Sequence, residues 1–229
     1  MNAGQSRAVV AGATGQVGEG VVAACVARGW QVTAVGRSAK GLSGLVSRLG
    51  DPDALRTMEL DPADGGWQRF VESIDTPQLV VASLGGWFSG PELAVLPRPD
   101  FERVLGDGLT AHLGAAQAFL PAMEQAGGGT YVMINGAAAL APVPGSGVVS
   151  VVTAAQLMLA RVLAAEAQAV TVRSLVIATP VLSRSRPDGP PGWVSARDVG
   201  STALALHTDP GSEVVVTLDR PVRGGDARA

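Results

Sequence analysis

The chain has 229 residues, of which 47% are hydrophobic and 16% are charged, and its net charge is −3. This composition is globular and excludes a disordered chain, and the lack of a basic excess argues against a nucleic-acid partner. Cys25 is the only cysteine, so no intrachain disulfide can form, and the first residues show no leader pattern; both features predict a cytoplasmic protein.

Short apolar runs, bounded by Gly, Pro or Asp, alternate with segments of helical periodicity along the chain. The runs predict strands at 8–11, 31–35, 56–60, 79–83, 130–134, 172–177 and 213–218. The segments between them predict helices at 17–28, 42–49, 67–73, 101–125, 149–168 and 196–206, with Ser195 capping the last. Strands that are apolar throughout are typical of a sheet buried on both faces. The order predicts one α/β domain over residues 1–229, a doubly wound parallel sheet of about seven strands, with a frayed tail at 220–229.

The most apolar stretch, 148–163, is interrupted by polar residues, among them Gln156 and Arg161. It is also shorter than the ~20 residues that cross a bilayer. It therefore predicts a buried helix, and no membrane association is expected.

Three glycines, Gly12, Gly15 and Gly18, lie between the first predicted strand and the first predicted helix. Such a loop lets the backbone turn sharply and approach a pyrophosphate, to which the helix N-terminus offers unpaired N–H groups. The spacing differs from G-x-G-x-x-G, and a tight turn without a ligand is the alternative. The position of the loop favours a Rossmann-type dinucleotide site. Its predicted cofactor-binding residues are Gly12, Thr14, Gly15, Gln16, Val17 and Gly18.

The residues after the second predicted strand distinguish the two nicotinamide cofactors. An acid there would bind the ribose hydroxyls of NAD, whereas this chain has Arg37 followed by Ser38. A guanidinium can hold a 2′-phosphate with two hydrogen bonds. The sequence thus predicts NADP(H) in preference to NAD(H), the alternative being a solvated surface arginine. Asp61, after the third predicted strand, is expected to accept from the adenine amino group or to form an Asp-Pro turn.

These features, with the segments 101–121, 129–134 and 154–157, resemble the short-chain dehydrogenase/reductase family from about Arg7 to Asp219. The resemblance implies an NADP(H)-dependent oxidoreductase fold. It places Ser83 and Gly85 beside the cofactor, although the usual Asn-Asn-Ala-Gly segment is altered there. The usual Pro-Gly after the sixth strand is replaced by Thr179-Pro180.

Members of this family usually act through a Tyr that transfers the proton, a Lys that lowers the pKa of this Tyr, a Ser that polarises the carbonyl, and an Asn that supports a water. By local register, the resemblance places these four positions at Val149, Thr153, Gly136 and Gly108, so all four catalytic side chains are absent. Tyr131, the only tyrosine, lies within a predicted strand, and no lysine follows Lys40. Carbonyl reduction by Tyr–Lys proton transfer is therefore not expected.

Three polar residues near these positions remain as weaker catalytic candidates: His112, Asn135 and Ser150. His112 is an acid/base candidate or a packing residue, and Asn135 could orient a carbonyl. The loops 85–99, 137–147 and 182–193 are expected to wall the pocket, the last as a lid. Trp87 or Trp193 is expected to stack on a flat substrate or to pack within the chain. No metal-ligand set is predicted.

Three functions are compatible with the sequence, so whether the chain is an enzyme is open at this point. The first is an NADP(H)-binding enzyme without the Tyr–Lys mechanism, either an atypical oxidoreductase or a cyclase or isomerase that acts on a small molecule. The second is an inactive NADP(H)-binding sensor or regulator, and the third is a subunit of a hetero-oligomer. A homo-oligomer through the two long helices is expected, with small contact residues at Ala111, Ala115, Ala118 and Ala155.

Overall fold

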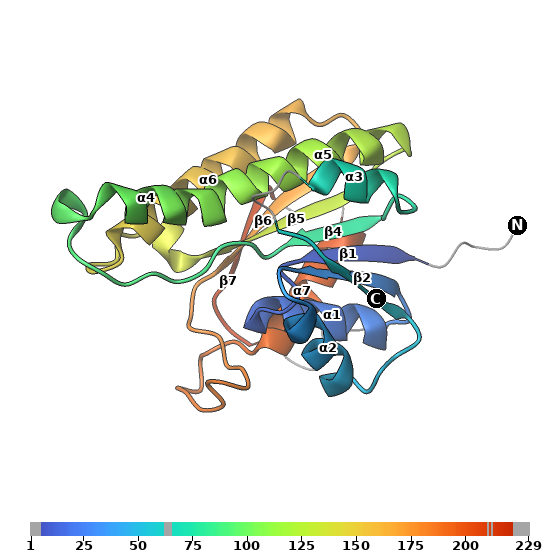
Figure 1. Cartoon of the computed structure of the whole chain (residues 1–229), viewed down its shortest axis with the longest axis horizontal. Helices are drawn as coiled ribbons and strands as arrows, with labels where there is room; N and C mark the ends of the chain where they lie inside the picture. The colour runs from blue at the N-terminus through green and yellow to red at the C-terminus, as the bar shows by residue number, and fades with distance from the viewer. Residues whose placement is uncertain (1–5, 62–65, 210, 212, 222–229) are drawn as a thin grey trace, which may run out of the picture.

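The computed structural model describes residues 6–61, 66–209, 211 and 213–221. Within them, seven strands form one parallel sheet in the order β3-β2-β1-β4-β5-β6-β7 (Figure 1). The chain runs outward from β1 to β2 and β3, then returns to place β4 on the other side of β1, so the strand order reverses between β1 and β4. The strands are β1 (Arg7–Ala11), β2 (Gln31–Gly36), β3 (Leu55–Glu59), β4 (Leu79–Ala82), β5 (Gly129–Gly136), β6 (Val170–Ile177) and β7 (Val215–Leu218). The predicted doubly wound sheet is confirmed.

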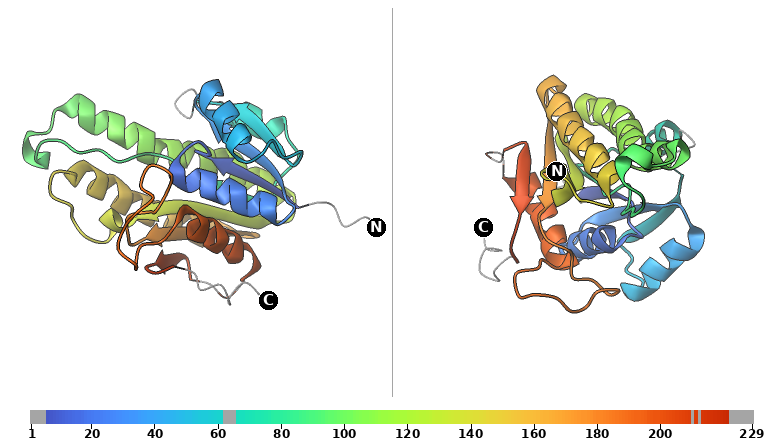
Figure 2. Two further views of the ribbon diagram at one scale, coloured as in Figure 1. Left: turned by 90° about the horizontal axis from the view of Figure 1, so that it is seen from below. Right: turned by 90° about the vertical axis from the view of Figure 1, so that its left-hand side faces the viewer.

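Helices cover both faces of this sheet, as Figures 1 and 2 show. One face carries α1 (Gln16–Ala27), α2 (Ala39–Arg48) and α7 (Ala196–Thr208), and the other carries α3 (Trp67–Glu72), α5 (Ala111–Gln125) and α6 (Gly147–Glu166). Side chains of successive strand residues point to opposite faces, so Val10 belongs to the apolar cluster under α1 and α7, and Val9 to the one under α5. Two separate apolar layers therefore hold the helices to the sheet.

The predicted helix 101–125 is divided in the structure. It consists of α4 (Arg98–Leu105), a π-helical turn η3 (Gly106–Thr110) and α5. Such π turns widen a helix by one residue and occur frequently at functional sites. α4 and the segment before it extend beyond the carboxyl ends of the strands (Figure 1), so η3 lies beside those ends.

Two predictions at the C-terminal end of the fold have different outcomes. Ser195 caps α7 in a reciprocal capping box, in which its hydroxyl accepts from the Asp198 N–H at 3.1 Å and the Asp198 carboxylate accepts from the Ser195 N–H at 2.7 Å. The last strand begins at Val215, two residues later than predicted. Of the predicted frayed tail 220–229, only Arg220 and Pro221 lie within the described residues.

By length and composition alone, α6 could cross a membrane. In the structure its inner residues Val148, Val149, Val152, Leu157 and Ala160 are buried, as predicted for a helix packed on the sheet. The small residues expected to form a contact between subunits include three that face the chain's own interior, so that prediction is wrong for Ala111, Ala115 and Ala118. The exposed apolar side chains of the long helices are Leu113, Val151, Met158 and Val162.

Candidate functional site

The glycine loop is held tightly between the ends of β2 and β4. The N–H groups of Gly12 and Ala13 both donate to the Val35 carbonyl at 3.0 Å. Gly12 has a φ of +78°, and a Cβ on it would lie 2.0 Å from the Ser83 carbonyl oxygen. A Cβ on Gly18 would lie 2.2 Å from the Gly12 carbonyl oxygen. Gly12 and Gly18 are therefore required by the packing of the chain itself.

Gly15 differs from these two glycines. It is exposed, its φ of −73° suits any residue, and a Cβ on it would meet only the Gly12 carbonyl oxygen, at 3.3 Å. Gly15 is the N-cap of α1, and no side chain caps this helix end, so first-turn N–H groups of α1 face outward without a side-chain acceptor. Bare backbone at an open helix N-terminus fits an anionic group of a ligand.

The loop after β6 covers the side of this helix end. The Ser183 hydroxyl donates to the Gln16 side-chain oxygen at 2.6 Å, and the Gln16 amide donates to the Ser185 hydroxyl. The Arg184 guanidinium lies 4.0 Å from the Glu19 carboxylate. The predicted lid segment 182–193 is thus attached to the glycine loop through Gln16.

The other residues predicted to bind the cofactor next to β2 also have roles in the fold. The Thr14 methyl group packs against Gly36 and Gly41, where added Cβ atoms would lie 2.9 and 3.2 Å from it. The Ser38 hydroxyl accepts from the Gly41 N–H at 3.3 Å and caps α2. Val17 is half-buried against the core. Thr14 and Ser38 thus shape the crevice at the carboxyl ends of β1, β2 and β4, on the side of Arg37.

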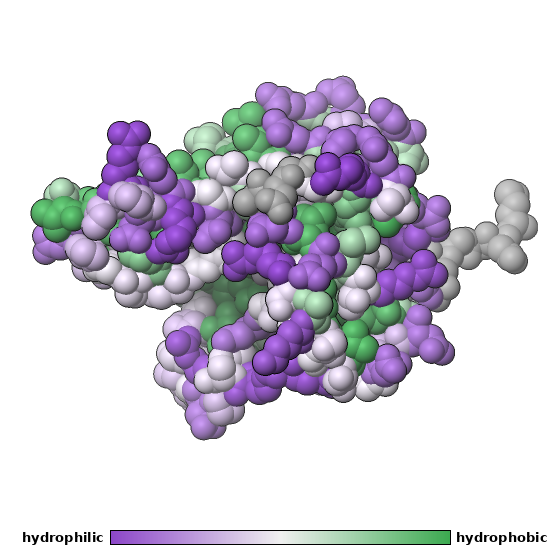
Figure 3. All heavy atoms as spheres, viewed as in Figure 1, coloured by the Kyte–Doolittle hydropathy of each residue, from purple (hydrophilic) through white to green (hydrophobic). Residues whose placement is uncertain are grey.

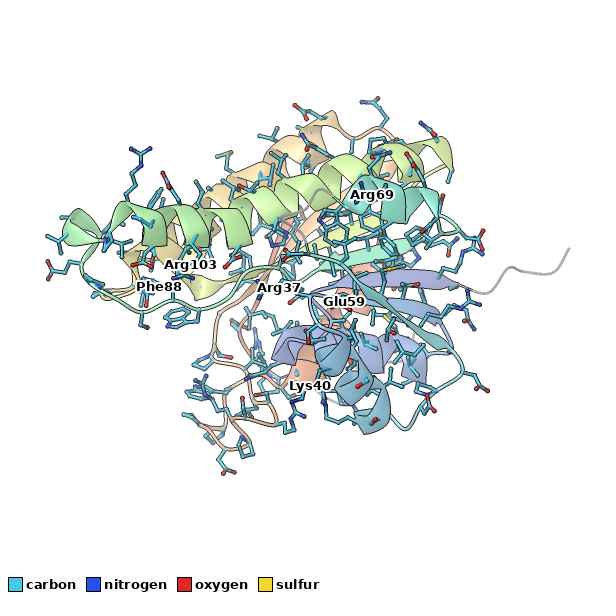
Figure 4. The ribbon with its side chains drawn as sticks, in the orientation of Figure 1. Arg37, Lys40, Glu59, Arg69, Phe88 and Arg103 are labelled. Atoms are coloured by element: carbon cyan, nitrogen blue, oxygen red, sulfur yellow. The ribbon has the colours of Figure 1, made fainter. Side chains whose placement is uncertain are left out.

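An open cavity of about 500 Å³ lies at the carboxyl end of β3, against α3. Its charged lining residues are Arg37, Glu59, Asp61 and Arg69, and Phe70 forms part of its apolar wall. Figure 4 shows Arg37 and Arg69 on two sides of this region, together with Glu59, the last residue of β3. The structure therefore brings together Arg37 and Asp61, which the sequence assigned to the adenosine half of the cofactor.

The Arg37 guanidinium is not simply solvated. It lies 3.6 Å from the Asp107 carboxylate of η3, although both side chains are largely exposed. Gly85, with a φ of +88°, brings the loop after β4 against this turn, since a Cβ on it would lie 3.3 Å from Gly108 Cα. Asp107 thereby reaches the crevice, although no motif in the sequence selects this residue.

The four positions that the resemblance assigns to the catalytic side chains have different surroundings. At Gly108 an added Cβ would lie 2.6 Å from Val152 Cγ1 and 3.1 Å from Gln156 Nε2, so this position is filled by α6. At Gly136 an added Cβ would meet nothing within 4 Å. Val149 is buried, and the Thr153 hydroxyl donates to the Val149 carbonyl at 2.7 Å.

The three weaker catalytic candidates are buried or hydrogen-bonded within the fold. His112 is fully buried, and desolvation lowers its pKa to about 4, against a smaller opposing effect of the Leu84 backbone. The Asn135 amide donates to the Thr153 carbonyl at 2.9 Å, and its oxygen accepts from the Gly136 N–H at 2.8 Å. The Ser150 hydroxyl accepts from the Val143 N–H at 3.0 Å. None of the three presents a free acid or base to the crevice.

Burial also affects three other titratable side chains, those of Tyr131, Cys25 and His207. Tyr131 is fully buried, and burial raises the pKa of its phenol above the usual value. Burial raises the pKa of the Cys25 thiol to about 12. His207 is half-buried: its Nδ1 lies 3.0 Å from the Thr130 hydroxyl and its ring packs edge-on against Trp30. Among the described residues, no cluster of three His, Cys, Asp or Glu side chains could hold a metal.

Apolar side chains line the outer part of the site. Figure 3 shows a hollow with hydrophobic residues inside it, between the α4 segment and the loop after β6. Exposed apolar residues on the neighbouring loops are Trp87, Leu93, Val95 and Leu140. Trp87 is 66% exposed and its indole N–H donates to the Ser89 hydroxyl at 2.9 Å. Trp193 is instead half-buried, with the Arg186 guanidinium 5.7 Å from its ring centre.

Comparisons with known proteins agree with this architecture. The family model for short chain dehydrogenases matches residues 6–186, whereas no curated protein matches. The fold is similar to that of a short-chain type dehydrogenase/reductase from Mycobacterium ulcerans, with a TM-score of 0.85 and 22% identity, covering 96% of this chain and 89% of that chain.

Two further solved structures are similar in fold. An oxidoreductase of the short chain dehydrogenase/reductase family from Burkholderia thailandensis has a TM-score of 0.79 and 21% identity, covering 93% of this chain and 91% of that chain. ElxO with NADP bound has a TM-score of 0.80 and 13% identity, covering 93% of this chain and 96% of that chain. Since the family model covers most of the sequence, the chain belongs to the short-chain dehydrogenase/reductase family.

Proposed function

We propose that this protein binds NADP(H) at the carboxyl ends of β1, β2 and β4, and that it works without proton transfer by a Tyr–Lys pair. The observation that carries the first part is Gly15. The chain's own packing limits Gly15 only moderately, since an added Cβ would lie 3.3 Å from the Gly12 carbonyl oxygen, whereas a pyrophosphate at the open N-terminus of α1 would leave no room for a side chain. The crevice lies where the strand order reverses, which is the usual ligand site of such sheets.

The preference for NADP(H) depends on Arg37. Its guanidinium follows β2 and borders the cavity that also contains Asp61, where a 2′-phosphate could receive two hydrogen bonds from it. The similarity in fold to ElxO, solved with NADP bound, supports this choice. In this arrangement Gly12 and Gly18 shape the pyrophosphate loop, and Ser83 and Gly85 border the cofactor beyond β4.

The proposed chemistry follows from the side chains around the positions assigned to catalysis. A bound NADPH would supply a hydride to a substrate held in the crevice. Val149 has no proton to give, and Asn135 and Ser150 are engaged in the fold. The substrate must therefore need no proton from the protein, as holds for a cationic iminium carbon, which a hydride alone neutralises. The apolar residues Trp87 and Leu140 would exclude water and orient such a substrate.

The binding part of the proposal can be measured by isothermal titration calorimetry of the full chain with NADPH and with NADH. We expect one site per chain and tighter binding of NADPH. Tighter binding of NADH would refute the assignment of Arg37, and no heat with either dinucleotide would refute cofactor binding itself. The chemistry can be tested by following NADPH consumption with ketones, enones and cyclic iminium ions, of which we expect the ketones to be inert.

Val152 fills the space that a side chain at position 108 would need, and this observation favours a second function, that of an NADP(H)-binding sensor. A site whose assigned catalytic position is packed by neighbouring side chains could retain the cofactor crevice for regulation alone. Tight NADPH binding without consumption of any electrophile would select this function over the enzyme.

We also propose that the protein is cytoplasmic and that it forms a homo-oligomer through α5 and α6. The support for the oligomer is the set of exposed apolar residues on the two helices: Val151, Met158 and Val162 on α6, and Leu113 on α5. A monomer in multi-angle light scattering would remove this part of the proposal.

A further inference from the structure

The ion pair between Arg37 and Asp107 crosses the crevice. Arg37 directly follows β2, and Asp107 belongs to η3, which contacts Gly85 after β4. In the sheet β1 lies between β2 and β4. The pair therefore spans the carboxyl end of β1, above the point where Gly12 begins the glycine loop.

Contacts on both sides of Gly12 connect the loop after β2 to η3. The Gly12 N–H donates to the Val35 carbonyl at 3.0 Å on the β2 side. On the β4 side, a Cβ on Gly12 would lie 2.0 Å from the Ser83 backbone oxygen, and a Cβ on Gly85 would lie 3.7 Å from the Asp107 backbone oxygen. The ion pair closes this path at 3.6 Å.

Arg37 is thus paired with the Asp107 carboxylate, an anion, through the same guanidinium that would bind a 2′-phosphate. Two anions at one guanidinium repel each other, so a carboxylate 3.6 Å from Arg37 opposes the approach of a phosphate to the same group. Both side chains are exposed, at 65% and 46%, so the pair is weak enough for a ligand to separate.

We propose that Asp107 is a specificity-determining residue: it competes with the cofactor 2′-phosphate for Arg37 and so limits the preference of this protein for NADP(H) over NAD(H). The proposal rests on the proposed function of the crevice. In the free protein Arg37 is paired with Asp107, and binding of NADP(H) separates the pair, whereas NAD(H) carries no group that competes for Arg37. Free protein and NADP(H) complex then differ in the position of the Asp107 carboxylate relative to β2.

The test is calorimetric titration of NADPH and NADH into the wild type, Asp107→Asn and Asp107→Ser. Removing the carboxylate is expected to tighten NADPH binding about three- to tenfold and to change NADH binding by less than about twofold, consistent with an exposed pair. Two variants are used so that a folding defect in one still leaves the other. In an Arg37→Ala background, Asp107→Asn should give no gain for NADPH, since the shared partner is gone.

Asp75→Asn is the matched control. It removes the same charge from a pair of similar distance, 3.7 Å to Arg7, which begins β1 and so lies at the opposite end of the sheet. Its ratio of NADH to NADPH dissociation constants should equal that of the wild type. An unchanged or lowered ratio in both Asp107 variants would overturn the role of Asp107 while leaving the proposed crevice intact. A wild type that binds neither dinucleotide would overturn both proposals.

Discussion

At Gly108, the position assigned to the family's catalytic Asn, the structure predicts how a single added methyl group changes the stability of the fold. Gly108 lies in η3, and a Cβ placed on it would lie 2.6 Å from Val152 Cγ1. Val152 is buried on α6 and cannot turn away into solvent. Gly108→Ala must therefore push η3 and α6 apart, although the substitution adds only one methyl group.

The magnitude follows from two opposing effects. Overpacking a well-packed interior by one group costs about 1–3 kcal/mol, while replacing glycine by alanine within a helix returns about 0.5–1 kcal/mol. We expect a net loss of about 1–2 kcal/mol in the free energy of unfolding, or roughly 2–8 °C in melting temperature for a chain of this size.

The assay is urea unfolding of Gly108→Ala beside Gly106→Ala, the same change two residues earlier in η3, where an added Cβ meets nothing within 4 Å. The control should be as stable as the wild type or slightly more stable. A Val152→Ala background should reduce the loss at Gly108, because the two residues are in contact and their effects are coupled. Equal stability of the two glycine variants would refute the conclusion that α6 fills this position.

Three further outcomes are expected. Gly12→Ala should lower the free energy of unfolding by more than about 2 kcal/mol, because Gly12 has a positive φ and an added Cβ would collide with the Ser83 backbone oxygen. Gly15→Ala should lower the free energy of unfolding by less than about 1 kcal/mol but should weaken NADPH binding. Urea unfolding measures the first effect and calorimetry the second, and equal destabilisation by the two variants would contradict the distinction between these glycines. Gln16→Ala should release the loop after β6, so that trypsin cleaves at Arg184 faster than in the wild type, and an unchanged cleavage rate would show that the Gln16 contacts do not hold the loop. Burial lowers the pKa of His112 from 6.5 to about 4, so between these pH values the unfolded chain binds a proton at His112 that the folded chain does not. The free energy of unfolding is therefore unaffected by this group above pH 6.5 and falls by about 3 kcal/mol as the pH is lowered to 4. Urea unfolding from pH 7 to pH 4 should therefore show a flatter decline for His112→Leu, and parallel profiles would count against this burial effect.

Local signals in the sequence were sufficient for the architecture. The central strands β1 and β4 are largely apolar runs, and the cap of α7 can be recognised from Ser195 and Asp198 within a single turn. The glycine loop was recognisable because its position between a strand and a helix is itself local. What these features share is that each depends on residues close together in the chain.

The state of the site depends instead on contacts between distant segments. The sequence shows that position 108 is a glycine. It does not show that Val152 fills the space beside this glycine, because that contact depends on how α6 crosses η3. The pairing of Arg37 with Asp107 likewise requires the loops after β2 and β4 to meet above β1. The lone His112 was a reasonable acid/base candidate, and only its complete burial removes it. Helix periodicity alone did not place the face of α5 that carries Ala111 and Ala115, which pack inward.

The central claim is that this family fold retains its dinucleotide crevice, and a crystal structure of the full chain with NADPH tests it most directly. We predict the pyrophosphate at the N-terminus of α1 beside Gly15, the 2′-phosphate hydrogen-bonded to Arg37, and Asp107 separated from that guanidinium. Crystals grown at saturating NADPH that show the cofactor away from the glycine loop, or show no cofactor, would contradict the claim.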